Sequence, residues 1–97
     1  MSDDEILDEL FAVVESRKEE LPEGSYTTSL FTHEKGENAV LEKLGEEMTE
    51  LILAAKDDDT DEIAHEAADI IYHMFVLLSM QEMTLDELRA ELRERYS

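Results

Sequence analysis

Apolar residues recur at helical spacing in two long blocks of this sequence, and no other feature restricts its fold as strongly. In the first block, from Asn38 to about Lys56, they lie three, four and seven residues apart, and only Gly45 weakens the pattern. The second block extends to about Met80 and is apolar on almost every side from Ile70 to Leu78, as expected of a helix surrounded by neighbours. The sequence therefore predicts two long helices, of which the second is central.

Two shorter helices are expected before these blocks. The first follows a capping-box pattern at Ser2 and Glu5 and ends before Pro22. A second, short helix opens within Ser25–Phe31 and stops around Gly36. The acidic run 57–61 offers N-cap residues for the central helix, and it lacks the ligand spacing and central glycine of a calcium loop.

A last helix completes the expected fold. Thr84 and Glu87 form a second capping box, and the helix that follows ends near Tyr96. The predicted fold is all-α, with four to five helices in an antiparallel bundle that forms one domain over residues 1–97. A chain this short buries a smaller fraction of its surface than a longer one, so we expect a homodimer or higher homo-oligomer to complete the core.

The charge balance limits the partners of this chain. It carries 27 acidic and 8 basic residues, a formal net charge of −19, so neither a nucleic acid nor an anionic membrane is an expected partner. Such a surplus suits a high-salt cytoplasm, because molar salt shortens the screening length to about 3 Å. Without cysteine there is no disulfide and no thiolate metal site. With no secretory signal and no bilayer-spanning stretch expected, we predict a cytoplasmic protein.

Two pairs of carboxylates suggest a metal site. Glu47 with Glu50, and Glu66 with Asp69, each lie three residues apart and therefore share a helix face. Antiparallel helices can bring the pairs together, and oxygen ligands of this kind suit Mg²⁺, with Mn²⁺ as an alternative ion. In so glutamate-rich a chain, the same spacing also fits a solvated acidic face. The position of Glu66 and Asp69 beside the most apolar segment favours the metal site.

Lys43 and His73 lie on the same faces as these carboxylates. Lys43 precedes Glu47 by four residues, where it contacts a phosphate oxygen or forms an intrahelical ion pair. His73 follows Asp69 by four residues, where it orients a carboxylate, contacts a substrate or packs as a structural histidine. At each position, a functional role and a purely structural role both stay open.

Two segments carry a resemblance to a known family. Lys43-Leu44-Gly45-Glu46-Glu47-Met48-Thr49-Glu50 and Glu66-Ala67-Ala68-Asp69-Ile70-Ile71-Tyr72-His73 resemble phosphoribosyl-ATP pyrophosphatases. That family belongs to the MazG-like all-α nucleoside triphosphate pyrophosphatases, whose signature is Glu-Glu-x-x-Glu followed by Glu-x-x-Asp. The Ser25-Tyr26-Thr27 segment and the run 51–56 extend the match over nearly the whole chain.

The resemblance implies an enzyme that hydrolyses phosphoribosyl-ATP to phosphoribosyl-AMP and pyrophosphate, the second step of histidine biosynthesis. It implies that water activated by magnesium is the nucleophile, and that Glu46 serves a second ion or acts as the water-activating base. The implied metal ligands are Glu47, Glu50, Glu66 and Asp69, and the implied substrate-binding residues are Ser25, Tyr26, Thr27, Lys43 and His73.

Three other functions compete with this one. Within the same superfamily, the substrate can be another nucleoside triphosphate, which makes the protein a house-cleaning pyrophosphatase of the nucleotide pool. From another class, the chain can be a non-catalytic acidic helical interaction module. A di-iron carboxylate site is the weakest alternative, because Glu62-x-x-His65 has the spacing of such sites but has no second copy.

The charge surplus predicts that stability rises with KCl up to molar concentration, because salt screens the repulsion between surface carboxylates. Thermal melts in increasing KCl measure this directly. A melting temperature that stays flat or falls between low and molar KCl would contradict the prediction.

Overall fold

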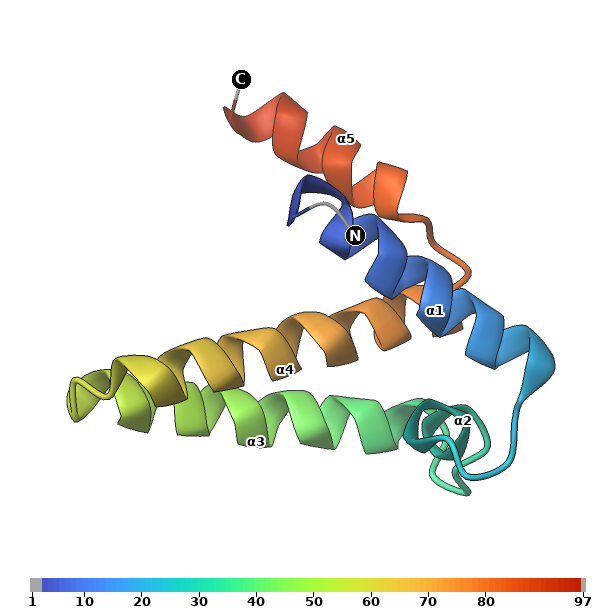
Figure 1. The fold of residues 1–97 in the computed structure, drawn as a ribbon, viewed down its shortest axis with the longest axis horizontal. Helices are drawn as coiled ribbons and strands as arrows, with labels where there is room; N and C mark the ends of the chain where they lie inside the picture. The colour runs from blue at the N-terminus through green and yellow to red at the C-terminus, as the bar shows by residue number, and fades with distance from the viewer. Residues whose placement is uncertain (1–2, 97) are drawn as a thin grey trace.

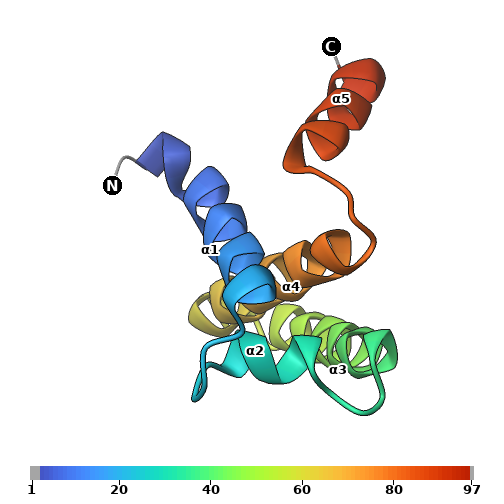
Figure 2. The same cartoon turned by 90° about the vertical axis from the view of Figure 1, so that its right-hand side faces the viewer.

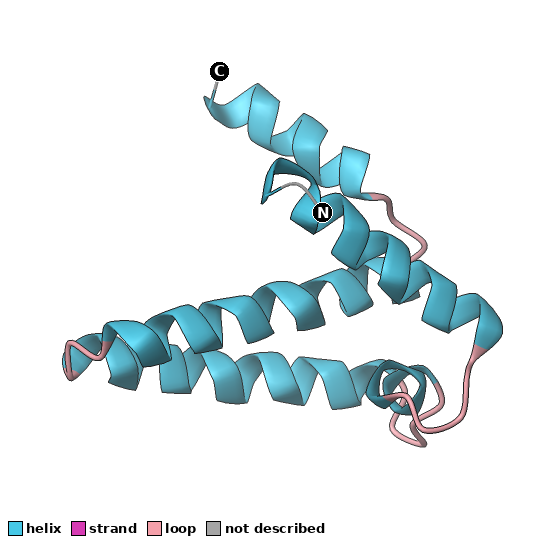
Figure 3. Cartoon of the chain, viewed as in Figure 1, coloured by secondary structure: helices cyan, strands magenta, loops and turns pink. Residues whose placement is uncertain are grey.

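Helices account for all of the regular secondary structure in the computed structural model, which describes residues 3–96 (Figure 1). No strand occurs in that range, so the predicted all-α fold is confirmed (Figure 3). In chain order, the elements are a 3-10 helix at Asp3–Glu5 and the α-helices α1 (Ile6–Glu20), α2 (Tyr26–Phe31), α3 (Glu37–Lys56), α4 (Thr60–Met80) and α5 (Leu85–Tyr96).

The long helices α3 and α4 lie antiparallel and side by side, and they form the most extensive helix pair of the chain (Figure 1). The short acidic turn between them reverses the chain, with Asp58 in the left-handed region at φ 54°. Asp59 then caps α4, because its side chain accepts the Glu62 backbone N–H at 3.2 Å. The acidic run is therefore a turn and a helix cap, as the sequence predicted.

The core lies where α1 and α2 pack against this pair. The rings of Phe11 on α1 and Phe75 on α4 meet edge to face, with their centroids 5.5 Å apart. Helix α4 contacts α3 on one side and α1 on the other, so its predicted central position is confirmed. Helices α1 and α5 extend to one side of the α3–α4 pair (Figure 2). The buried core residues are Phe11, Val14, Leu30, Val40, Phe75, Val76 and Leu85.

Most helix ends agree with the sequence patterns. Helix α1 ends at Glu20 as predicted, and Leu21 caps it in a left-handed conformation with its N–H on the Arg17 carbonyl. The Thr84–Glu87 capping box is confirmed: the Thr84 N–H donates to Glu87 Oε2 at 2.8 Å, and the Glu87 N–H donates to Thr84 Oγ1 at 3.2 Å. The other predicted capping box depends on Ser2, which lies outside the described residues.

One expectation about α4 needs correction. By length and composition alone, this helix is apolar enough to cross a membrane, contrary to the prediction that no stretch would be. The core helix of a soluble protein meets the same criteria. Here α4 packs against both α1 and α3, and three of its buried residues, Glu66, His73 and Ser79, are polar.

Candidate active site

Glu66 is the most constrained carboxylate of the molecule. Its side chain lies in the α3–α4 pair with the residue only 3% exposed, and its Oε1 atom is buried without a hydrogen-bond partner. Glu50 from α3 and Glu62 from the preceding turn of α4 approach the same carboxyl group. Hydrogen bonding with Glu50, then with Glu62, followed by desolvation, raises the pKa of Glu66 to about 7. A shared proton or a bound cation is needed to hold three carboxyl groups together here.

Glu47 faces the same helix pair but has a different partner. It is buried on α3, and its Oε1 lies 2.8 Å from Nδ1 of His73 on α4. The same Nδ1 lies 3.0 Å from the Asp69 carbonyl oxygen. Because both of these neighbours only accept, Nδ1 must carry the hydrogen. His73 therefore donates to Glu47 and fixes one of its two oxygens.

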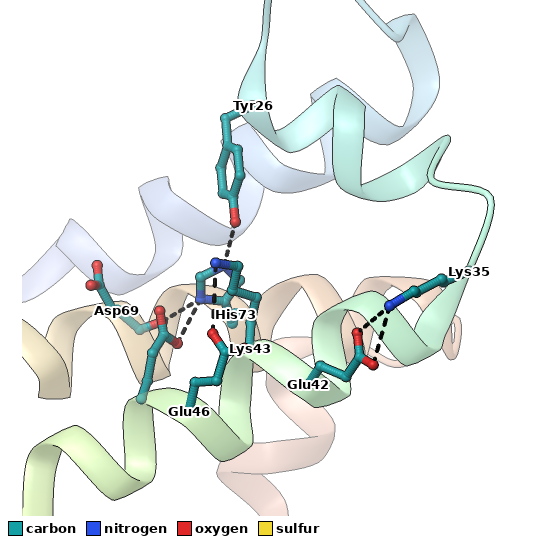
Figure 4. Close-up of polar contacts among 8 residues, drawn as sticks. Tyr26, Lys35, Glu42, Lys43, Glu46, Asp69 and His73 are labelled. Carbon is teal, nitrogen blue, oxygen red and sulfur yellow. Dashed lines mark hydrogen bonds and ion pairs between the residues drawn. The ribbon is translucent and has the colours of Figure 1, made fainter.

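Tyr26 completes a chain of side chains across three helices. Its hydroxyl, on α2, lies 3.1 Å from Nε2 of His73 (Figure 4). Burial raises the pKa of Tyr26, and the negative charges of Glu47, Asp69 and Glu46 raise it further. The phenol thus stays protonated, and in the tautomer of His73 that carries its hydrogen on Nδ1, Nε2 accepts from the Tyr26 hydroxyl. Tyr26, His73 and Glu47 form a continuous hydrogen-bonded series from α2 through α4 to α3.

The four predicted metal ligands do not form one compact group in this structure. Glu50 and Glu66 meet, whereas Glu47 is held by His73, and Asp69 Oδ2 lies 3.4 Å from Nε2 of His65. The side chains whose ligand atoms all lie within 4.8 Å of one another are instead Glu62, His65 and Glu66. The predicted ligand set thus stays a prediction.

Glu62 belongs to the site, although the sequence pattern pairs it only with His65, at the spacing of a di-iron site. Its position four residues before Glu66, on the same face of α4, was the available signal. In the structure, Glu62 lies close to Glu66 and contributes to raising the pKa of that residue.

Lys43 and Glu46 lie at the edge of the site. Lys43 Nζ is 3.8 Å from Glu46 Oε2 on the exposed side of α3, so the intrahelical ion pair is the contact that Lys43 makes in the free protein. Both residues, together with Tyr26, line a pocket of about 210 Å³ between α2 and α3. The pair therefore lies between this pocket and the buried carboxylates.

Three of the residues predicted to contact the substrate have partners within the free protein, and their contact with substrate stays a prediction. Both ring nitrogens of His73 are occupied and the residue is buried, so it positions Glu47 and offers no free nitrogen to a substrate. Thr27 is also buried, and its hydroxyl is hydrogen-bonded to that of Tyr72. Ser25 caps α2 by accepting the Thr28 N–H at 3.3 Å. Ser25 and Thr27 thus anchor the helix that carries Tyr26.

Comparison with known proteins gives a consistent result. Residues 7–96 match the family model described as phosphoribosyl-ATP pyrophosphohydrolase. A phosphoribosyl-ATP pyrophosphatase of Haloarcula marismortui is 75% identical, over 98% of this chain and 99% of its own. Its counterpart from Natronomonas pharaonis is 79% identical over 95% of this chain and 91% of its own. A histidine biosynthesis bifunctional protein, HisIE, of Halalkalibacterium halodurans is 47% identical over 94% of this chain, which spans 42% of that protein.

The raised pKa of Glu66 predicts a specific pH dependence of stability in the absence of divalent ions. Between its ordinary pKa of 4.5 and the folded value of about 7, the folded protein holds a proton that the unfolded chain has lost. The free energy of unfolding therefore falls as pH rises through this range, and the loss is complete above pH 7. Urea unfolding in EDTA at constant molar KCl, from pH 5 to pH 8, measures it.

The Glu66→Gln variant should lose this part of the pH dependence, because its amide does not titrate. Glu23→Gln, an exposed change in the α1–α2 connection, is the matched control and should behave like the unmodified chain. Identical pH profiles for the unmodified chain and Glu66→Gln would contradict the assignment.

Proposed function

Because this chain belongs to the phosphoribosyl-ATP pyrophosphohydrolase family, we propose that it performs the family reaction at the carboxylates gathered around Glu66. The chain is a hydrolase of histidine biosynthesis that converts phosphoribosyl-ATP to phosphoribosyl-AMP and pyrophosphate. Water adds across the anhydride bond between the α- and β-phosphates, so one oxygen and two hydrogens are distributed over the two products. Family membership decides against the non-catalytic interaction module.

The unpartnered oxygen of Glu66 is the observation that supports a cation at this place. A buried carboxylate oxygen with no donor, next to two further carboxyl groups, is a poor arrangement without positive charge and a good one with it. Oxygen-only ligands are those that Mg²⁺ prefers, and Mn²⁺ accepts them too. We assign Glu47, Glu50, Glu66 and Asp69 as its ligands, with Glu62 as an added member. The bound ion would neutralise phosphate charge and lower the pKa of a coordinated water.

The remaining residues of the site act on position and charge. The hydrogen bond from His73 fixes Oε1 of Glu47 and leaves Oε2 for the ion, while Tyr26 holds the imidazole in the tautomer that this requires. Lys43 reaches phosphate oxygens when its weak contact with Glu46 opens. Glu46, once free of Lys43, is the group that takes the proton from the attacking water.

A second copy of the chain is the partner that we propose in addition to the nucleotide. The accessible surface of 6790 Å² exceeds by roughly 1,100 Å² that of a compact protein of this mass. The radius of gyration of 14.5 Å likewise exceeds the expected value of about 12.5 Å. This excess is comparable to the roughly 800 Å² that each partner buries in a standard interface. The excess surface of this chain is thus large enough to be the area that one partner buries in a dimer.

An exposed apolar stripe on α3 is the face that fits this second copy. Leu41, Met48 and Ile52 lie seven and four residues apart, so they share one side of the helix, and they are 43%, 46% and 54% exposed. Pairing this stripe with its counterpart would cover apolar surface without covering Glu66.

We further propose a cytoplasmic location, because the acidic surplus suits an interior of high salt, as does similarity to proteins of halophiles.

Magnesium binding and catalysis should depend on the same carboxylates. In the double variant Glu47→Gln, Asp69→Asn, we expect calorimetric Mg²⁺ binding to weaken at least tenfold and hydrolysis of phosphoribosyl-ATP to fall by two or more orders of magnitude, because two anionic ligands are lost. Glu19→Gln, an exposed change on α1, is the control. Unchanged activity in the double variant would refute the proposed metal site.

Product analysis under the same conditions tests the substrate. At saturating Mg²⁺ and molar KCl, phosphoribosyl-ATP should be cleaved much faster than dUTP or dCTP. The opposite order would instead identify a house-cleaning pyrophosphatase of the nucleotide pool.

The α3 stripe predicts the assembly state. Sedimentation in molar KCl should give at least twice the 11.2 kDa chain mass, and Met48→Glu should shift it towards the monomer, because it buries a charge in the interface. Leu53→Glu, which is as exposed but lies outside the stripe, should have no such effect. A monomeric unmodified chain, or a Met48→Glu variant that stays associated, would exclude this interface.

A further inference from the structure

We infer that the pocket between α2 and α3 binds the nucleoside part of the substrate and that His33 is the residue that recognises it. The inference rests on the proposed function, because it assumes that the phosphates lie at the carboxylates of α3 and α4. None of the residues assigned above to metal binding forms the floor of this pocket. Its volume of about 210 Å³ accommodates a flat ring and part of a sugar.

The inner surface of the pocket suits an aromatic ring. Leu30 and Ala39, only 3% and 8% exposed, form an apolar floor. The ring of Tyr26 and the imidazole of His33 also line it. Flat aromatic side chains next to an apolar floor are the surroundings in which a nucleobase stacks and loses water favourably.

His33 supplies a directed hydrogen-bond donor at this surface. Its Nδ1 accepts the backbone N–H of Lys35 at 3.0 Å, so Nδ1 carries no hydrogen and the neutral ring is protonated on Nε2. That backbone contact holds the ring in the tight turn that follows α2. The Nε2–H group is then the donor that His33 presents to a ring nitrogen or a ribose oxygen.

The rim of the pocket matches the sugar and the first phosphate. Glu42 places a carboxylate there, which accepts hydrogen bonds from ribose hydroxyls. Lys35 balances this charge, with its Nζ 3.1 Å from Glu42, and Lys43 lies on the same rim, where it reaches the first phosphate. This balance makes the rim less repulsive to a nucleotide than the rest of a chain with a net charge of −19.

The pocket is continuous with the carboxylate site through two shared residues. Tyr26 lines the pocket and also donates to His73, and Glu46 lines it beside Glu47 in the sequence (Figure 4). A nucleotide whose phosphates lie at Glu47 therefore has its sugar and base within reach of His33. The order of groups along the substrate matches the order of side chains along the cleft.

The test compares binding of the whole nucleotide with binding of its phosphate end, at saturating Mg²⁺ and molar KCl. In His33→Ala, we expect KM for phosphoribosyl-ATP to rise roughly tenfold with kcat within about twofold, because one hydrogen bond and one stacking surface are lost. Binding of AMP, measured by calorimetry, should weaken by a similar factor. Inhibition by inorganic pyrophosphate should stay unchanged, since pyrophosphate occupies only the metal side.

Two further variants keep the result unambiguous. Ala39→Leu fills the floor of the pocket without changing charge and should raise KM in the same way. Glu34 is next to His33 in the sequence but does not line the pocket, so Glu34→Ala should leave KM unaltered. Unchanged KM and AMP affinity in both pocket variants would overturn the inference, as would equal weakening of pyrophosphate inhibition. If the unmodified chain cleaves no phosphoribosyl-ATP, the proposed function fails, while AMP binding still decides the pocket.

Discussion

Repulsion among carboxylates across the α3–α4 pair is the constraint on which the site depends. Glu66 is buried with one oxygen unpartnered, and Glu50 and Glu62 approach the same group. In water these three residues would separate, but the antiparallel packing of two long helices holds them together. The proposed metal ion would offset the repulsion among these carboxylates and the charge of a polyanionic substrate. Our proposal thereby accounts for nucleotide binding by so acidic a chain.

The rest of the fold keeps this arrangement in place. The contact between Phe11 and Phe75 fixes α1 across α4. The short helix α2 is capped by Ser25 and joined to α4 by the hydrogen bond between the hydroxyls of Thr27 and Tyr72. Tyr26 on α2 then reaches His73, which in turn orients Glu47. The short helix therefore has two functions, since it orders one carboxylate and forms one wall of the neighbouring pocket.

Helical periodicity was enough to predict the elements of this fold, because each apolar stripe lies within a single helix and each cap is a local contact. The Thr84–Glu87 box and the cap at Asp59 are examples. Periodicity also placed Glu47, Glu66 and His73 on the right faces. It did not give the partners, since the Tyr26–His73 bond joins residues 47 positions apart, and the closeness of Glu50 and Glu66 depends on how two helices are aligned. Glu62 is different, because its position four residues before Glu66 on the same helix is a local signal that the sequence does contain.

The most direct test of this account is a crystal structure grown with Mn²⁺ at molar KCl, with the ion located by its anomalous scattering. The account predicts an ion within bonding distance of the Glu66 carboxylate, on the side of Glu50, with Glu47 still held by His73. An anomalous map with no ion at Glu66, or with Glu66 still sharing a proton with Glu50 while the ion lies elsewhere, would contradict it.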